Sequence, residues 1–245
     1  APAAAEPEPA PEPTEETLAD KQTRLSAILL ERMRHLQHSW GTSAALPPKS
    51  EIIKAEELRK GEWPEKSWEQ SRQAKEQAKA LVIKPKEVFD AAAKVFGGTR
   101  GEGAFDPRQI YDALELATNQ YILETRGVVD EIFQEESGPD RSTPIQKAMV
   151  SAARMHRLQY HLPLQSWRTE STEKFQQFST PADYAYAVVW AANVQPNDIA
   201  MEPSAGTGNL AVHMMNAGPA QVIVNEIAEE RHDLLRSLGF ESESI

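Results

Sequence analysis

The chain has 245 residues, no cysteine and a formal net charge of -11. The absence of cysteine excludes disulfides, thiolate nucleophiles and cysteine-bound zinc. The acidic balance argues against a surface that coats nucleic acid uniformly, and no apolar run reaches the ~18 residues that a membrane span needs.

Residues 1–16 form a Pro/Glu-rich tail. We expect this tail to be disordered, because it cannot bury enough apolar surface to fold. From Leu18 to Trp40, apolar residues recur at helical spacing and predict an amphipathic helix. Shorter helices are expected after Ser50 and after Ser67.

We predict that residues 17–170 form a helical region without strands. A helix begins at Pro85 and ends at the glycines that follow residue 96. Asp106-Pro107 and Thr143-Pro144 each combine an N-cap residue with a first-turn proline, which predicts two long helices that reach about residues 127 and 161.

The pattern changes in residues 171–245. Helices are expected over 181–193, 209–217 and 228–239, and short strands over 198–202 and 221–226. This alternation of strands and helices predicts the start of a parallel α/β sheet. The expected fold is therefore an α-helical N-terminal region followed by a partial Rossmann-like α/β domain.

A glycine loop connects the first predicted strand to the next helix. Gly206 and Gly208 let the backbone turn sharply and approach a ligand closely. The helix N-terminus adds free N–H groups and the positive end of a dipole. Glu226, at the end of the following strand, stands where a carboxylate can accept the hydroxyl groups of a ribose.

The residue before the loop bears on which nucleotide is bound. Glu202 would point a carboxylate into the site, where it would repel a pyrophosphate but attract an ammonium group. The methionine end of S-adenosylmethionine therefore fits better than a nicotinamide dinucleotide, which remains a weaker alternative. No lysine follows Gly208, so the loop is not a phosphate-binding Walker A loop.

The stretches Gln-Gln-Phe-Ser-Thr-Pro181, Glu202-Pro-Ser-Ala-Gly-Thr-Gly-Asn-Leu-Ala and Val224-Asn-Glu-Ile resemble the adenine-N6 DNA methyltransferases, a class I methyltransferase family. More narrowly, they are similar to phage and bacterial fusions in which a methyltransferase-like domain precedes a strawberry-notch-type helicase. Some of those fusions are antirestriction factors packaged in virions. The resemblance covers roughly residues 175–240.

The resemblance implies a role for seven residues in binding S-adenosylmethionine. It implies that Phe178, Thr180 and Pro181 line the methionine side of the cofactor. It also implies that Glu202, Gly206 and Gly208 form the loop and that Glu226 holds the ribose.

The family's catalytic Asp/Asn-Pro-Pro-Tyr/Phe motif grips the exocyclic amine of the target adenine. The only Pro-Pro pair here, Pro47-Pro48, has no acid or amide before it and no aromatic after it. We therefore expect residues 171–245 to be the N-terminal part of a truncated methyltransferase-like domain that is inactive alone. A two-stranded sheet also leaves edges unpaired, so a downstream helicase-like domain or another chain would complete it.

The helix after Pro144 carries a basic set that predicts contact with DNA phosphates: Lys147, Arg154, Arg157 and His161, with Arg168 beyond its end. Helical spacing places the first four on one face. The simpler interpretation is a solvated face that balances the acidic remainder.

Two functions therefore remain in view. One is S-adenosylmethionine binding in the service of adenine-N6 DNA methylation, in a phage or mobile-element antirestriction protein of the bacterial cytoplasm. The alternative is a structural, virion-associated or ejected protein with a vestigial methyltransferase fold. No metal site and no membrane partner are expected.

Overall fold

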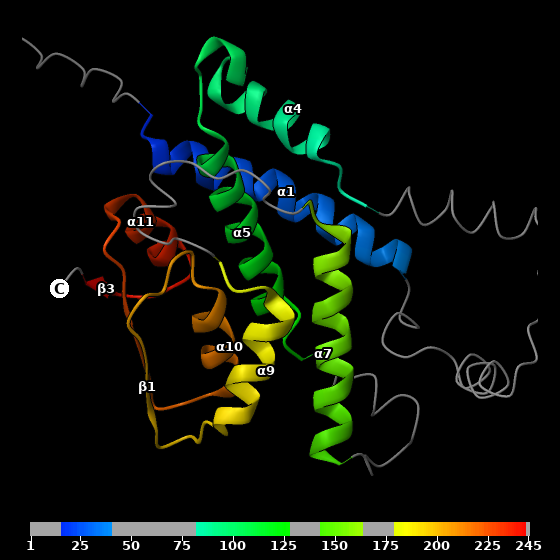
Figure 1. The fold of residues 1–245 in the computed structure, drawn as a ribbon, viewed down its shortest axis with the longest axis vertical. Helices are drawn as coiled ribbons and strands as arrows, with labels where there is room; N and C mark the ends of the chain where they lie inside the picture. The colour runs from blue at the N-terminus through cyan, green and yellow to red at the C-terminus, as the bar shows by residue number, and fades with distance from the viewer. Residues whose placement is uncertain (1–15, 41–81, 128–142, 164–178, 244–245) are drawn as a thin grey trace, which may run out of the picture.

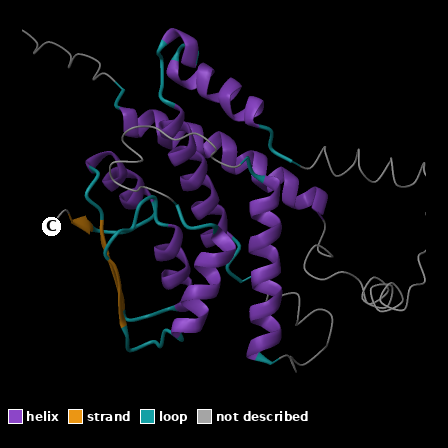
Figure 2. Ribbon diagram, viewed as in Figure 1, coloured by secondary structure: helices purple, strands orange, loops and turns teal. Residues whose placement is uncertain are grey.

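A computed structural model describes residues 16–40, 82–127, 143–163 and 179–243. These ranges exclude residues 1–15 of the tail, the helices expected after Ser50 and after Ser67, and the candidate residues Phe178 and Arg168. The described elements follow the chain in this order (Figures 1 and 2): α1 (Leu18–Trp40), α4 (Pro85–Phe96), the 3₁₀ turn η2 (Arg100–Glu102), α5 (Pro107–Glu124), α7 (Pro144–His161), α9 (Ala182–Ala192), β1 (Ile199–Glu202), α10 (Asn209–Ala217), β2 (Gln221–Asn225), α11 (Glu229–Ser237) and β3 (Ser242–Glu243).

Local sequence signals set the ends of the helices. The Asp106 carboxylate accepts the Arg108 N–H at 2.7 Å at the start of α5, and the Thr143 hydroxyl accepts the Gln146 N–H at 3.3 Å at the start of α7. Helix α4 ends at Gly97, whose φ of 76° is left-handed. The predicted boundaries of these helices are confirmed to within a few residues.

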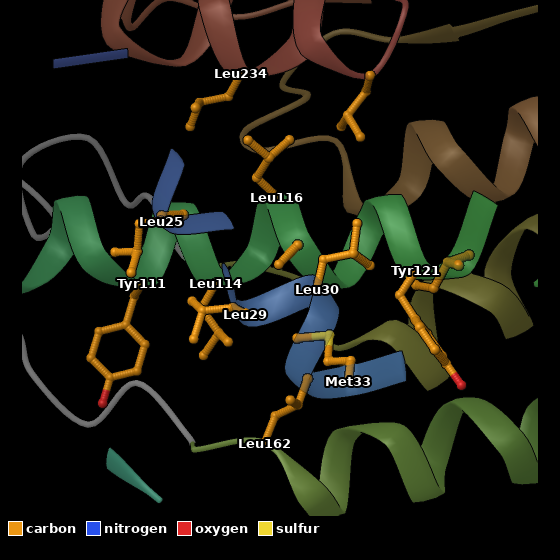
Figure 3. Close-up of a cluster of buried hydrophobic side chains, with 14 of the residues drawn as sticks. Leu25, Leu29, Leu30, Met33, Tyr111, Leu114, Leu116, Tyr121, Leu162 and Leu234 are labelled. Atoms are coloured by element: carbon orange, nitrogen blue, oxygen red, sulfur yellow. The ribbon is translucent and has the colours of Figure 1, made fainter. Parts of the chain in front are cut away.

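Helices α1 and α5 form the centre of the molecule. Leu25, Leu29 and Met33 repeat every four residues along α1 and are buried, facing Leu114 and other apolar residues of α5 (Figure 3). Each fully buried aliphatic side chain contributes about 1.5–3 kcal/mol. The packing of these two helices therefore contributes substantially to the stability of the fold.

The hydrophobic core continues from the helical region into the α/β part. Leu234 of α11 lies over Leu116 of α5 in the same cluster, which also contains Val224 of β2 (Figure 3). The two parts expected from the sequence thus share one core. No helix in the described ranges is both long enough and apolar enough to cross a membrane.

The sheet is parallel, small and lies at one edge of the molecule (Figure 2). β1 pairs with β2 over four residues, from Ile199 opposite Gln221, and β2 pairs with β3 at Val224 opposite Ser242. The sequence predicted two strands, and the third was missed. Two residues are too few to show a strand period, so the order β1-β2-β3 became visible only in the structure.

One face of the sheet is apolar and uncovered within the described residues. Ile199 and Met201 are 65% and 51% exposed, and their neighbour Ile223 on β2 lies on the same face. Helix α10 packs against both strands, beside the alternate residues such as Val224. The candidate site lies where β1 meets α10.

Candidate functional site

The glycine loop lies at the corner between β1 and α10. Gly206 has φ 58° and Gly208 has φ 99°, a left-handed conformation that glycine adopts without strain. A Cβ on Gly208 would also lie 2.9 Å from Leu238 Cδ1. Both the backbone angle and the packing therefore require glycine at position 208.

Glu226 follows β2 and contacts this loop directly. Its Oε2 accepts the Gly206 N–H at 2.7 Å, and its Oε1 accepts the Ala228 N–H at 2.9 Å. The residue is only 5% exposed. Residues 206 and 226 are thus brought together, and the carboxylate already holds two backbone N–H groups.

Glu202, the last residue of β1, flanks the loop on its other side. This half-buried carboxylate accepts the Ser204 N–H at 3.1 Å through Oε1, which closes the turn after the strand. Two acids therefore border the loop, and a cationic group would meet a favourable field there.

The Thr180-Pro181 segment reaches the same corner. Pro181 is the N-cap of α9, and the Thr180 carbonyl accepts the Asn209 side-chain N–H at 2.9 Å. Asn209 is the first residue of α10. The structure thus places Thr180 and Pro181 beside the loop, and their role in binding a cofactor stays a prediction.

Helix α5 supplies polar groups that the sequence analysis missed. Glu115 Oε2 accepts hydroxyl hydrogens from Ser179 at 2.7 Å and from Thr207 at 2.5 Å. The Asn119 side chain donates to the Thr207 carbonyl at 2.9 Å. The glycine loop is therefore fixed to a helix far earlier in the sequence, since Thr207 and Glu115 are 92 residues apart.

A buried ion pair lies beneath the loop. Arg231 of α11 donates to Asp112 of α5 at 2.9 Å, and both side chains are 5% exposed. Burial lowers the pKa of Arg231, but the Asp112 carboxylate together with those of Glu115 and Glu226 outweighs this effect, and the pKa is raised overall. A Cβ on Gly206 would lie 3.6 Å from this guanidinium, so the pair underlies the loop directly.

Burial raises the pKa of the Glu115 carboxyl, and the Asp112 carboxylate adds to this effect, whereas the Ser179 and Thr207 hydroxyls lower the pKa.

The polar residues of α5 lie on one face of the helix, because Asp112, Glu115 and Asn119 stand at positions i, i+3 and i+7. This polar stripe on an otherwise apolar helix is the sequence signal that could have identified these three residues.

The basic face predicted for α7 does not form an exposed basic surface. His161 is only 8% exposed, and Arg154 is half-buried and hydrogen-bonded to Tyr121 of α5. Lys147 and Arg157 are also half-buried. Their spacing does place these residues on one face, as predicted, but this face packs largely inward, and contact between it and DNA stays a prediction.

The exposed face of α7 is instead mostly apolar, with Ile145, Met149 and Tyr160 outermost. His156, also on this side, pairs with Asp183 of α9 at 2.8 Å. Within the described ranges, no group of three or more His, Asp or Glu residues could hold a metal ion.

Comparison with known proteins found no matching family model, no matching curated protein and no matching solved structure.

Proposed function

We propose that the corner formed by β1, the glycine loop and α10 binds S-adenosylmethionine. The single observation that carries this proposal is the hydrogen bond from the Gly206 N–H to Glu226. It brings a loop that can accommodate a close ligand next to an acid that can accept ribose hydroxyls. An ionised carboxylate has about four acceptor positions, so two remain after the bonds from Gly206 and Ala228.

The sheet order supports the proposal. In a parallel sheet all strands end at the same edge, and ligands of open α/β sheets bind at the carboxyl ends of the strands. The order β1-β2-β3 is compatible with one half of a doubly wound dinucleotide-binding sheet, and this compatibility supports the proposal. Glu202 favours a ligand whose ammonium group lies near the loop over one with a pyrophosphate.

We further propose that the cofactor serves adenine-N6 methylation of DNA in a phage or mobile-element antirestriction protein. The ground for this reaction and this substrate is the resemblance of residues 175–240 to that methyltransferase family. The chain carries no recognisable motif for gripping the target amine, so the property to test is cofactor binding.

The test is calorimetric titration with S-adenosylmethionine, with NAD as the competing ligand. We expect S-adenosylmethionine to bind, NAD not to bind, and Glu226→Gln to weaken binding at least tenfold by removing a charged acceptor. Glu202→Gln should also weaken it, and this half-buried position is the check if the first variant does not fold. Glu229→Gln, an exposed acid in the first turn of α11, is the matched control.

Absence of binding would refute the cofactor proposal. Binding to which both Glu226→Gln and Glu202→Gln are indifferent would refute the assigned site.

A second candidate is a structural, virion-associated protein that retains the corner for packing only. One observation favours it: Glu226 is buried, and each of its oxygens already accepts a backbone N–H. Mass spectrometry of purified virions would then find the chain in a fixed ratio to the other virion proteins, and the chain would not bind S-adenosylmethionine. Binding that depends on Glu226 would refute this candidate.

A further inference from the structure

A cavity of about 570 Å³ lies between α5, α7, α9 and α10. It borders the C-terminal half of α10, at His213, Asn216 and Ala217, whereas the glycine loop lies at the N-terminus of that helix. The four helices pack together in the half of the molecule that contains α7 and α9 (Figure 1). The volume of the cavity is within the range of about 300–1,000 Å³ that is typical of small-molecule sites.

The cavity wall contains a buried histidine with an unused acceptor. The His213 ring donates to the Ala182 carbonyl, and its Nε2 has no hydrogen-bond partner in the described part of the chain. The residue is 5% exposed, and burial lowers its pKa to about 4. At neutral pH the ring is therefore uncharged, and Nε2 presents a lone pair that calls for a donor.

Asn216 provides a second acceptor of the same kind. It lies three residues after His213, hence on the same side of α10, and its Oδ1 is buried without a partner among the described residues. A buried polar atom without a partner costs about 1–3 kcal/mol, and native structures contain few of them. Two on one wall indicate that a ligand with N–H donors belongs there.

The cavity lining also contains two arginines. Arg154 of α7 lines the cavity and its guanidinium is hydrogen-bonded to Tyr121, and Arg126 follows the C-terminal end of α5. No aspartate or glutamate is among the described residues that line the cavity. A guanidinium retains several donors beyond the one used by a phenol, so an anionic group on a ligand would find a partner here.

Aromatic side chains complete the wall. Tyr186 packs edge-on against His213 with ring centroids 5.6 Å apart, and Trp190 lines the cavity while remaining half exposed. A flat ligand placed beside them would cover the indole and gain stacking energy.

We propose that this cavity binds an anionic ligand with a flat, aminated ring, the chemistry of an adenine mononucleotide. The amine donates to His213 Nε2 and Asn216 Oδ1, the phosphate pairs with Arg154, and the ring packs beside Trp190. This site is independent of the glycine loop. S-adenosylmethionine carries a carboxylate, but its ammonium and sulfonium make it a net cation, so it suits the arginine residues less well than a phosphate monoester does.

The test is calorimetric titration with three probes: adenosine monophosphate, inosine monophosphate, which lacks the amine, and adenosine, which lacks the phosphate. We expect adenosine monophosphate to bind at least tenfold more tightly than either of the others. Arg154→Gln should remove the preference for phosphate, and Asn216→Leu should reduce the preference for the amine. Arg157→Gln, three residues further along α7, is the matched control.

Asn216→Leu removes a buried polar atom that lacks a partner and should fold normally, so it guards against misfolding of other variants. Titration with S-adenosylmethionine should give the same affinity in Asn216→Leu as in the unaltered chain, which separates the two sites. The proposal is overturned if adenosine monophosphate does not bind at millimolar concentration. It is equally overturned if folded Arg154→Gln and Asn216→Leu variants bind all three probes as the unaltered chain does.

Discussion

The two ends of α10 differ in how their polar groups are satisfied. At the N-terminal end, the glycine loop and the first residue of α10 are hydrogen-bonded to α5, to Thr180 before α9 and to Glu226 after β2. At the C-terminal end, His213 and Asn216 each bury an acceptor without a partner in the described residues.

This difference separates two kinds of binding site. A loop fixed by its own protein is preorganised, so a ligand that binds there incurs little additional ordering cost. A cavity with unpaired acceptors is stabilised when a ligand supplies the missing donors. The conformation of the glycine loop should therefore depend strongly on the protein contacts around it. The stability of the cavity end should depend on whether a ligand is bound and on pH.

The largest effect is expected at the ion pair beneath the loop. Asp112→Ala should lower the free energy of unfolding by about 3–5 kcal/mol, because it leaves the Arg231 guanidinium buried without its partner. Urea denaturation measures the change. Asp90→Ala is the control, since it removes the exposed ion pair with Lys86 on α4 and should cost under about 1 kcal/mol. Similar losses in both variants would contradict the structural role of the buried pair.

Glycine substitutions compare the two ends of the helix directly. Gly208→Ala should cost about 3 kcal/mol, from its left-handed backbone and the close Leu238 contact together. Gly218→Ala, at the C-terminal cap with φ 76° and open space around it, should cost about 1–2 kcal/mol from the backbone alone. Thermal unfolding followed by circular dichroism gives both values, and equal costs would show that the loop is not closely packed.

A pH effect is expected at the cavity end. The pKa of His213 is about 4 in the folded chain, below the 6.5 of a free histidine, so its contribution to stability is complete above pH 6.5 and falls as pH drops toward 4. Between pH 7 and pH 5 this amounts to about 2 kcal/mol. His213→Asn keeps a donor for the Ala182 carbonyl but does not titrate, so its unfolding free energy should fall less over this range. An unchanged pH dependence in the variant would contradict the burial of the ring.

The elements of the fold were largely predictable because local signals specify them. The N-caps Asp106 and Thr143 fixed the starts of α5 and α7, and the apolar repeat from Leu18 fixed α1. Strand β3 was not predictable, since its two residues carry no period of their own and depend on pairing with β2. The glycine corner could be predicted because its residues are adjacent in the chain.

The surroundings of the corner could not be predicted in the same way. Glu115 and Asn119 reach the loop only because α5 packs across it, and contacts over such separations have no local signal. The basic residues of α7 show the same limit in reverse. Spacing put Arg154 and His161 on one face, but tertiary packing decided that this face turns inward while Met149 and Tyr160 face solvent.

The smallest effect is expected at Glu115 and tests whether hydrogen bonding or charge holds the loop. The folded pKa of Glu115 is raised, so its ionisation opposes folding, and stability from this group is lost as pH rises above the ordinary range of a glutamate. Glu115→Gln keeps an acceptor for the Ser179 and Thr207 hydroxyls and removes the charge. It should raise the unfolding free energy at pH 8 by on the order of 1 kcal/mol, with the gain shrinking toward pH 4.

Glu124→Gln on the same helix is the control, because that exposed carboxylate pairs with Arg34 and its loss should be slightly unfavourable instead. Urea denaturation at both pH values provides the comparison. If Glu115→Gln is destabilising at pH 8, the charge itself strengthens the two hydroxyl bonds enough to outweigh its burial. The loop would then be held by an ionised acid on α5, and the contrast between the ends of α10 would be one of charge as well as of hydrogen bonding.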